Sequence, residues 1–159
     1  MRFAFTEEQL LFRDSVRGLL VDACPASALR AAWENDHGLI PELWGKLTEL
    51  GITAMSIPED AGGLGMGAMD WVLVFEEAGR AGVPGPLAET VAVGAPLLAE
   101  LGSAATKAIL ENVIDGSTQL TVRLGSTEFL AHADSASLVL DTFLRCGLEN
   151  DEWRVRQDM

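Results

Sequence analysis

The sequence predicts a mainly α-helical protein in which six helices are followed by a short, incomplete β segment. Three observations lead to this prediction. Apolar residues recur at helical spacing through most of residues 7–114. Residues that cap or end helices separate these stretches. After Gly116 the spacing changes to the two-residue alternation of a half-buried strand, in residues 119–124 and again in residues 153–156.

Length and charge limit the classes of protein that this chain can belong to. With 159 residues, 48% of them apolar, the chain can form one domain, or one domain and part of a second. Lys and Arg number 11 against 24 Asp and Glu, a formal net charge of −13. Nucleic-acid binding depends on basic side chains that neutralise phosphates, so it is excluded as a main function. Adsorption to an anionic membrane surface is disfavoured for the same reason.

Cysteine usage and the absence of a leader pattern favour a soluble, cytoplasmic protein. Cys24 and Cys146 lie far apart, with no CxxC pair. We expect two reduced thiols in preference to one long-range disulfide. Residues 1–6 lack the basic start of a signal peptide, and no stretch approaches the ~20 apolar residues of a membrane helix.

The first helix is predicted to begin after Thr6, which forms a capping box with Gln9. Its apolar positions are spaced to lie on one face: Phe12, Val16, Leu19, Leu20 and Ala23. After Pro25, residues 26–33 form a short second helix. A turn at residues 35–38 precedes a third helix with Pro41 in its first position, Leu43, Leu47 and Leu50 on one face, and Gly51 at its end.

A glycine turn, Ile57–Gly67, follows a short apolar passage at residues 52–57. It contains four glycines within residues 62–67 and lies just before the fourth helix. Because helix N-termini bind anions, a phosphate cradle is one interpretation of this turn. The spacing is not GxGxxG and no clear strand precedes it, so a structural turn is favoured.

The fourth helix is predicted over residues 68–80, with Met69, Val72, Leu73 and Glu76 along its apolar stripe. Glu76 and Glu77 could suggest an acid–base pair. Consecutive helical residues point about 100° apart, so a solvated flank with one packing contact is favoured.

The fifth helix, residues 87–101, is nearly all apolar and is interrupted by Gly94 and Pro96. We expect Pro96 to kink or restart it. A helix that is apolar on most sides is typical of a domain core, which is favoured over the wall of a ligand cavity. Ser103 caps a sixth helix that ends at Ile114.

The change of pattern after Gly116 divides the chain into a helical domain, residues 1–116, and a partial β segment, residues 117–159. Short strands are predicted at residues 119–124, 138–140 and 153–156. Two or three such strands leave exposed edges, and so small a segment rarely folds alone. The helical domain, a partner chain or further polypeptide must therefore cover it.

Catalytic and metal-binding motifs are not found. His37 and His132 lie far apart, and there is no HExxH motif, Cys/His cluster, GxSxG elbow or Walker A loop. The proximity of Asp134 and Ser135 to His132 in sequence is poor evidence for a triad, which is a spatial arrangement. The sequence assigns no catalytic residue and no metal site.

The chain does carry an ordered series of short motifs, and in these it resembles the acyl-CoA dehydrogenase family over about residues 3–125. The most specific is residues 57–65 (IPEDAGGLG), and the others are residues 5–9 (FTEEQ), 43–44 (LW), 50–52 (LGI), 75–80 (FEEAGR), 101–103 (LGS) and 115–116 (DG). The start of the fifth helix, residues 86–90 (PLAET), is similar to the divergent actinobacterial branch that includes steroid side-chain degradation.

The resemblance implies a six-helix N-terminal bundle, then a β domain and a C-terminal helical bundle. The implied reaction is α,β-dehydrogenation of an acyl-CoA thioester, in which a glutamate removes the α proton and FAD accepts the β hydride. It also implies homo- or hetero-oligomers and an electron-transfer flavoprotein as electron acceptor. The N-terminal helices would form one wall of the acyl pocket, with Thr90, Val91, Gly94 and Leu97 facing the acyl group.

Departures from the family pattern are concentrated in the β segment and beyond it. The C-terminal bundle, which supplies the catalytic glutamate, is absent from these 159 residues. Residues 120–126 (LTVRLGS) are a degraded match to the family's flavin-contacting stretch, with Thr121 and Ser126 as its remaining flavin contacts. The chain is therefore interpreted as a subunit or fragment that works only with additional polypeptide, or as a non-catalytic partner that completes another subunit's pocket. A free-standing helical interaction domain rests on composition alone.

Overall fold

The computed structural model describes residues 4–124, 130–142 and 154–156. Within these residues it has six α-helices followed by three strands, as the sequence predicts. The helices are α1 (Glu7–Ala23), α2 (Ala26–Trp33), α3 (Leu43–Glu49), α4 (Ala68–Ala81), α5 (Ala95–Leu101) and α6 (Ala104–Ile114). The strands are β1 (Leu120–Leu124), β2 (Leu138–Thr142) and β3 (Arg154–Arg156). A π-helical segment, Glu89–Gly94, leads directly into α5, and short 3₁₀ turns lie at Ile52–Ala54 and Glu59–Ala61.

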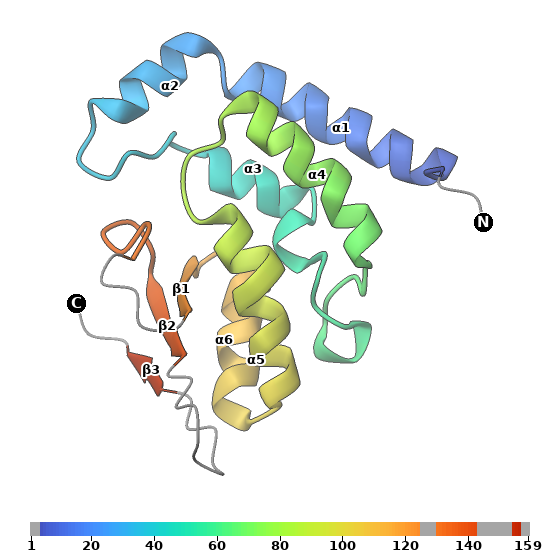
Figure 1. Ribbon diagram of the computed structural model, residues 1–159, viewed down its shortest axis with the longest axis vertical. Helices are drawn as coiled ribbons and strands as arrows, with labels where there is room; N and C mark the ends of the chain where they lie inside the picture. The colour runs from blue at the N-terminus through green and yellow to red at the C-terminus, as the bar shows by residue number, and fades with distance from the viewer. Residues whose placement is uncertain (1–3, 125–129, 143–153, 157–159) are drawn as a thin grey trace.

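Helix α1 confirms the predicted capping box and the predicted apolar face. The Gln9 N–H donates to Thr6 Oγ1 at 3.2 Å, and the Thr6 N–H donates to Gln9 Oε1 at 2.9 Å. These two bonds satisfy N–H groups that have no partner within the helix. The buried residues of α1 are Val16, Leu20 and Ala23. Through this face α1 packs along α4, as Figure 1 shows.

Helix α4 corrects the predicted apolar stripe. Its buried residues are Leu73, Val74, Glu77 and Ala78, whereas Met69 is 59% exposed and Val72 is 52% exposed. Periodicity fixes the spacing of a stripe, but the position of the neighbouring helix decides which stripe is buried. Here α1 lies along the side that includes Asp70 and Glu77.

Helix α3 begins later than predicted. Pro41 lies in a turn before it, and Glu42 takes a left-handed conformation with φ 63°. This conformation is rare for a residue with a Cβ. It turns the chain sharply, so that the helix starts at Leu43.

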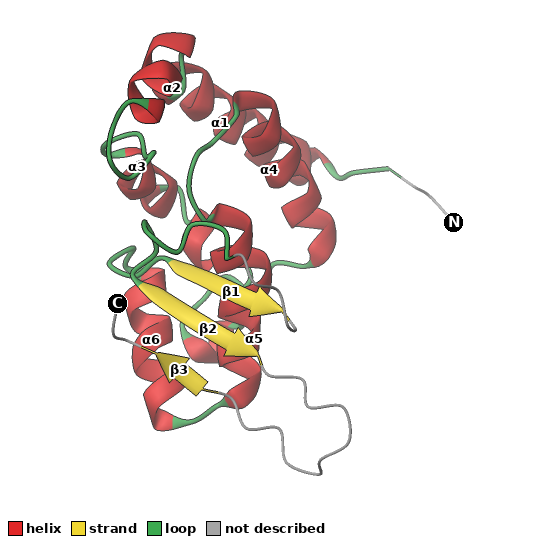
Figure 2. Cartoon of the chain, turned by 60° about the vertical axis from the view of Figure 1, so that its left-hand side comes forward, coloured by secondary structure: helices red, strands yellow, loops and turns green. Residues whose placement is uncertain are grey.

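The buried apolar side chains form two clusters. The first joins α1, α3, α4 and the π-helical segment, with Val16, Leu47, Ile52, Val74 and Val91 among its fully buried members. The second joins α5 and α6 to the sheet, through Leu98, Leu110, Val113, Leu120 and Leu138. Helices therefore cover one face of the sheet, as Figure 2 shows.

The sheet has the order β1-β2-β3. Strands β1 and β2 are parallel, with Leu120 opposite Leu138 and Val122 opposite Leu140. Strand β3 is antiparallel to β2. All three predicted strands are confirmed. Strand β1 forms an edge of the described sheet. The backbone groups on its outer side therefore need partners other than a strand of this sheet.

Two further findings concern the described residues. None of their helices is long and apolar enough to cross a membrane. Cys24 is a free, buried thiol, and burial raises its pKa. Cys146 lies outside the described residues, so the expectation of two reduced thiols is tested only at Cys24.

Candidate functional site

The residues that the resemblance places near substrate lie on a helix of mixed type. From Leu87 the chain is helical, widens into the π-helical segment and continues as α5. Pro96 lies in the first turn of α5 and has no N–H to donate to the preceding turn. The wider segment before it, in which the Ala95 N–H bonds to the Thr90 carbonyl, accommodates this loss. The sequence predicts that Pro96 kinks or restarts the helix; in the structure the helix changes from π to α type at Ala95, just before Pro96, and continues without a break.

Thr90 joins this helix to β1 through both of its hydrogen-bonding roles. Its Oγ1 donates to the Leu120 carbonyl at 2.9 Å and accepts the Leu120 N–H at 2.8 Å. Both residues are fully buried. A buried hydroxyl that both donates and accepts meets the requirement that buried polar groups be hydrogen-bonded. The Thr90 side chain is therefore held against the first residue of β1.

Val91, Gly94 and Leu97 occupy three different surroundings. Val91 is fully buried in the first cluster, among side chains of α1, α3 and α4. Gly94 is buried against Leu120, and a Cβ at position 94 would lie 2.8 Å from Leu120 Cδ1. Leu97 is partly buried and packs against the second cluster. The four candidate acyl contacts are thus brought together on one helix but do not share one open face.

Thr121, the first candidate flavin contact, is fully buried in β1. Its Oγ1 donates to the Ala131 carbonyl at 2.7 Å, which ties β1 to the chain that leads into β2. Ser126, the second candidate, lies outside the described residues.

The glycine turn uses its backbone donors within the chain. Each N–H from Gly62 to Gly67 donates to an acceptor of this protein: in order, the carbonyls of Glu59, Pro58, Ala54, Ile57 and Met55, and Oδ2 of Asp70. None of these groups is left to bind a phosphate, so the turn is structural. A Cβ on Gly63 would overlap the backbone of Ile57, which explains why this position needs glycine.

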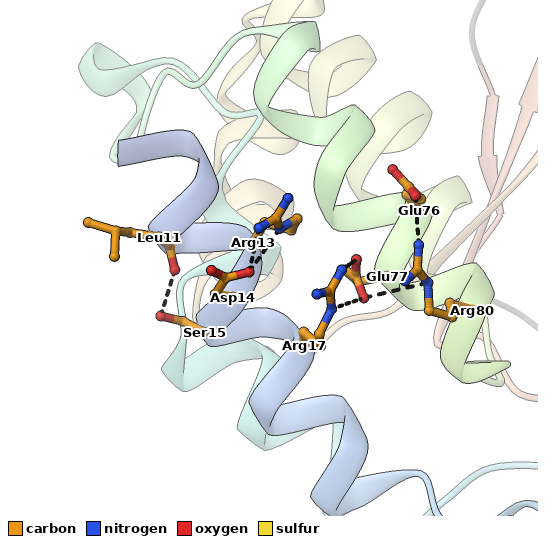
Figure 3. Close-up of polar contacts among 8 residues, drawn as sticks. All are labelled: Leu11, Arg13, Asp14, Ser15, Arg17, Glu76, Glu77 and Arg80. Carbon is orange, nitrogen blue, oxygen red and sulfur yellow. Dashed lines mark hydrogen bonds and ion pairs between the residues drawn. The ribbon is translucent and has the colours of Figure 1, made fainter. Parts of the chain in front are cut away.

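A charged cluster links α1 to α4 (Figure 3). Arg17 donates to both carboxylate oxygens of Glu77, at 2.6 and 2.9 Å, and Arg80 lies 3.9 Å from the same carboxylate. The Glu77 side chain is 2% exposed, whereas Glu76 is 55% exposed and pairs with Arg80. The hydrogen bonds from Arg17, together with the positive charge of nearby arginines, lower the pKa of Glu77.

This arrangement agrees with the expectation of a solvated flank with one packing contact, and it shows which of the two residues makes that contact. Glu76 is solvated, and Glu77 is a buried ion-pair residue that connects two helices. Its surroundings satisfy both oxygens and stabilise the charged form, so Glu77 is not suited to act as a general base. Among the described residues, no group of three or more His, Cys, Asp or Glu side chains could hold a metal ion.

Comparison with known proteins agrees with this fold and with the ordered motifs. Residues 6–117 match the acyl-CoA dehydrogenase N-terminal domain. The chain belongs to the acyl-CoA dehydrogenase family.

Proteins similar to this chain include a curated acyl-CoA dehydrogenase and two solved structures. Acyl-CoA dehydrogenase IpdE2 of Mycolicibacterium smegmatis is 35% identical over 136 residues, which is 85% of this chain and 42% of that protein. The Tcur3481-Tcur3483 steroid ACAD G363A variant has a TM-score of 0.75 and 26% identity, over 86% of this chain and 45% of that one. The ChsE4-ChsE5 complex from Mycobacterium tuberculosis has a TM-score of 0.74 over 90% of this chain and 45% of that one, and at 22% identity it shows the fold alone. The chain therefore spans less than half the length of these proteins.

Thr121 is the one candidate flavin contact among the described residues, and its hydroxyl is already engaged within the chain. The Thr121 hydroxyl, which the family resemblance assigns to the flavin, is buried and donates to Ala131. A flavin that used this hydroxyl as a donor would have to displace that bond.

The sequence singles out Thr90 and Glu77 but does not reveal the roles that they play in this region. The double role of Thr90 toward Leu120 depends on a contact between residues 30 apart in sequence. The burial of Glu77 depends on Arg17 of a different helix. A signal for the second was present, because Arg17 falls at helical spacing from Arg13 on the same side of α1.

Proposed function

We propose that this chain is part of an FAD-dependent acyl-CoA dehydrogenase and supplies the N-terminal helical wall of its acyl pocket. It would do so as a subunit or fragment that is competent only with additional polypeptide. The observation that carries this proposal is the family match over residues 6–117 in a chain that spans 42% of its relative's length. In this proposal residues 1–116 form the helical domain, and residues 117–159 are part of a middle β domain.

The proposed reaction is the family's oxidation of the Cα–Cβ bond of an acyl-CoA thioester. The additional polypeptide would supply the catalytic glutamate and most of the contacts to FAD, whose role when bound is to accept hydride. This chain would contribute the helix that contains Thr90, Val91, Gly94 and Leu97, held rigidly by Pro96, the π-helical segment and β1. A cytoplasmic location and electron transfer to an electron-transfer flavoprotein are part of this proposal.

We propose a steroid-derived acyl-CoA as the substrate class, with fatty acyl-CoA as the alternative. Support comes from the steroid ACAD variant, which is 26% identical and has the same fold over 86% of this chain. The ChsE4-ChsE5 complex shows that this fold occurs in assemblies of two different chains. A hetero-oligomer with a longer acyl-CoA dehydrogenase subunit is therefore the proposed assembly.

A second candidate function is a non-catalytic partner that completes the pocket of a longer subunit. The occupied hydroxyl of Thr121 favours it, because this strand then makes no flavin contact through that side chain. The two candidates differ in where the flavin of the assembly is bound.

Co-expression with a longer acyl-CoA dehydrogenase encoded nearby tests both candidates. We expect the two chains to elute together on size exclusion and to oxidise acyl-CoA with an electron-transfer flavoprotein as acceptor. Two separate peaks and no gain in activity would contradict both candidates. In an active complex, Thr121→Val should reduce flavin content if β1 contributes to the flavin site, and leave flavin content unchanged if this chain only completes the pocket.

A further inference from the structure

Thr90 takes the place of a neighbouring strand at the outer edge of β1. On the inner edge, the Leu138 N–H donates to the Gln119 carbonyl at 3.1 Å, so the backbone of Gln119 faces β2. Backbone groups of successive strand residues point to opposite edges, so those of Leu120 face away from β2. On that outer edge the Thr90 hydroxyl bonds both the N–H and the carbonyl of Leu120. One side chain thus satisfies the whole edge at this residue.

Gly94 provides the space that this contact needs. The Leu120 side chain lies where a Cβ of residue 94 would be, 2.8 Å from Cδ1 and 3.2 Å from Cβ of Leu120. Thr90 and Gly94 both belong to the π-helical segment, in which the extra residue per turn changes the direction of the side chains that follow. Both residues are buried, and both act on Leu120.

We propose that Thr90 and Gly94 are positioning residues that fix β1 on the helix, and that neither contacts the acyl group. This inference rests on the proposed function, for which the helix and β1 border the same pocket. Thr90 has no free donor and no exposed surface with which to contact a ligand. Gly94 has no side chain, and the space beside it is filled by Leu120. The contribution of both residues is to make the helix and the strand one rigid body.

Hydrogen exchange of the isolated chain, measured by NMR, tests directly whether Thr90 holds β1 on the helix. Thr90→Val keeps the shape of the side chain and removes both hydrogen bonds, and Thr90→Ser keeps the hydroxyl. Thr53→Val is the matched control, because Thr53 is also fully buried and its Oγ1 donates to the Ile114 carbonyl of α6 and not to β1. Protection factors are compared at Leu120, and at core amides of α1 and α4 as an internal reference.

We expect Thr90→Val to lower the protection of the Leu120 amide at least about tenfold relative to the core amides, since its acceptor is lost. Thr90→Ser should retain protection within about threefold, and Thr53→Val should leave Leu120 unchanged relative to the core. Unchanged protection of Leu120 in Thr90→Val, or an equal local loss in Thr53→Val, would contradict the proposal that Thr90 fixes β1 on the helix. Should Thr90→Val fail to fold, Thr90→Ser decides: a tenfold local loss in spite of the retained hydroxyl would also overturn it.

The functional half of the inference is tested in the co-purified complex with acyl-CoA substrates of different length. If Thr90 positions β1, Thr90→Val should lower kcat/KM by the same factor for short and long acyl groups, with recovery in Thr90→Ser. A factor that changes with acyl length would show that Thr90 contacts the acyl group. If no complex forms, the proposed function fails. The exchange experiment on the isolated chain still shows whether Thr90 fixes β1 on the helix, so the two failures are distinguishable.

Discussion

Glu77 shows how one buried charge holds two helices together. Its carboxylate is 2% exposed and receives two hydrogen bonds from Arg17 of α1. Arg17 itself is 41% exposed, so water remains available to it when the carboxylate is altered. The pair therefore differs from a fully desolvated ion pair, in which loss of one partner leaves a stranded charge.

Glu77→Gln should lower the free energy of unfolding at neutral pH by about 1–3 kcal/mol, because a charge-assisted bond is replaced by a neutral one. The lowered pKa of Glu77 means that its contribution is complete above the ordinary glutamate pKa of about 4.3. It is lost as the pH falls through the lowered value. The difference between the variant and the wild type should therefore shrink on acidification. Urea unfolding across this pH range measures it.

The neighbouring residue provides the control for this prediction. Glu76 is 55% exposed and pairs with Arg80 on the same helix, so Glu76→Gln should change stability by less than about 0.5 kcal/mol. Equal losses in the two variants would contradict the role of Glu77 as the residue that links α1 to α4.

Gly63 is the residue on which the glycine turn depends most. A Cβ there would overlap backbone atoms of Ile57, which cannot move as a flexible side chain can. Gly63→Ala should therefore cost at least about 3 kcal/mol in thermal or urea unfolding. Gly18→Ala is the control, since a Cβ on Gly18 of α1 meets nothing within 4 Å, and it should be neutral or stabilising by up to about 1 kcal/mol. A mild effect at Gly63 would mean that the turn is looser than described.

At the scale of elements, what the sequence predicts well is what depends on neighbours in the chain. The capping box of α1, the positions of the six helices and the three strands all follow from local spacing and local hydrogen bonds. The buried face of α4 does not, because α1 selects it. The π-helical segment does not either, since it reflects both Pro96 and the fit of Leu120 against Gly94.

In the candidate site, too, the sequence predicts the elements but not the contacts of their side chains. The ordered motifs identify the helix and the strand that border it, and residues 6–117 match the family. The side chains that face a ligand could not be predicted, because Thr90, Gly94 and Thr121 are all committed to contacts that join distant parts of the chain. The acyl-contact and flavin-contact assignments remain predictions.

Substitution of Gly94 tests how closely the helix and β1 are packed. Gly94→Ala should lower stability by about 1 kcal/mol, because overlap with Leu120 and the Glu89 carbonyl outweighs the gain in helix propensity. Gly94→Leu should cost more. Gly79→Ala in α4, where a Cβ meets nothing within 4 Å, should not be destabilising. If Gly94→Ala stabilised the chain as much as Gly79→Ala, the two elements would be separated by open space.

At the scale of the whole molecule, the described sheet is held by helices on one face and by Thr90 on its outer edge. This explains how the described strands of a β segment too small to fold alone can be held on the helical part. The chain spans less than half the length of these relatives. The hydroxyl of Thr121, the candidate flavin contact in β1, donates to the Ala131 carbonyl. We therefore expect a stable folded unit whose chemistry requires additional polypeptide.

This dependence on additional polypeptide is tested by flavin content. Visible absorbance is measured on the purified chain and on the chain co-expressed with a longer acyl-CoA dehydrogenase. We expect the chain alone to be folded, colourless and inactive with acyl-CoA, and the co-purified complex to be yellow and active. Stoichiometric flavin on the chain alone, with dehydrogenation of acyl-CoA, would contradict the requirement for additional polypeptide.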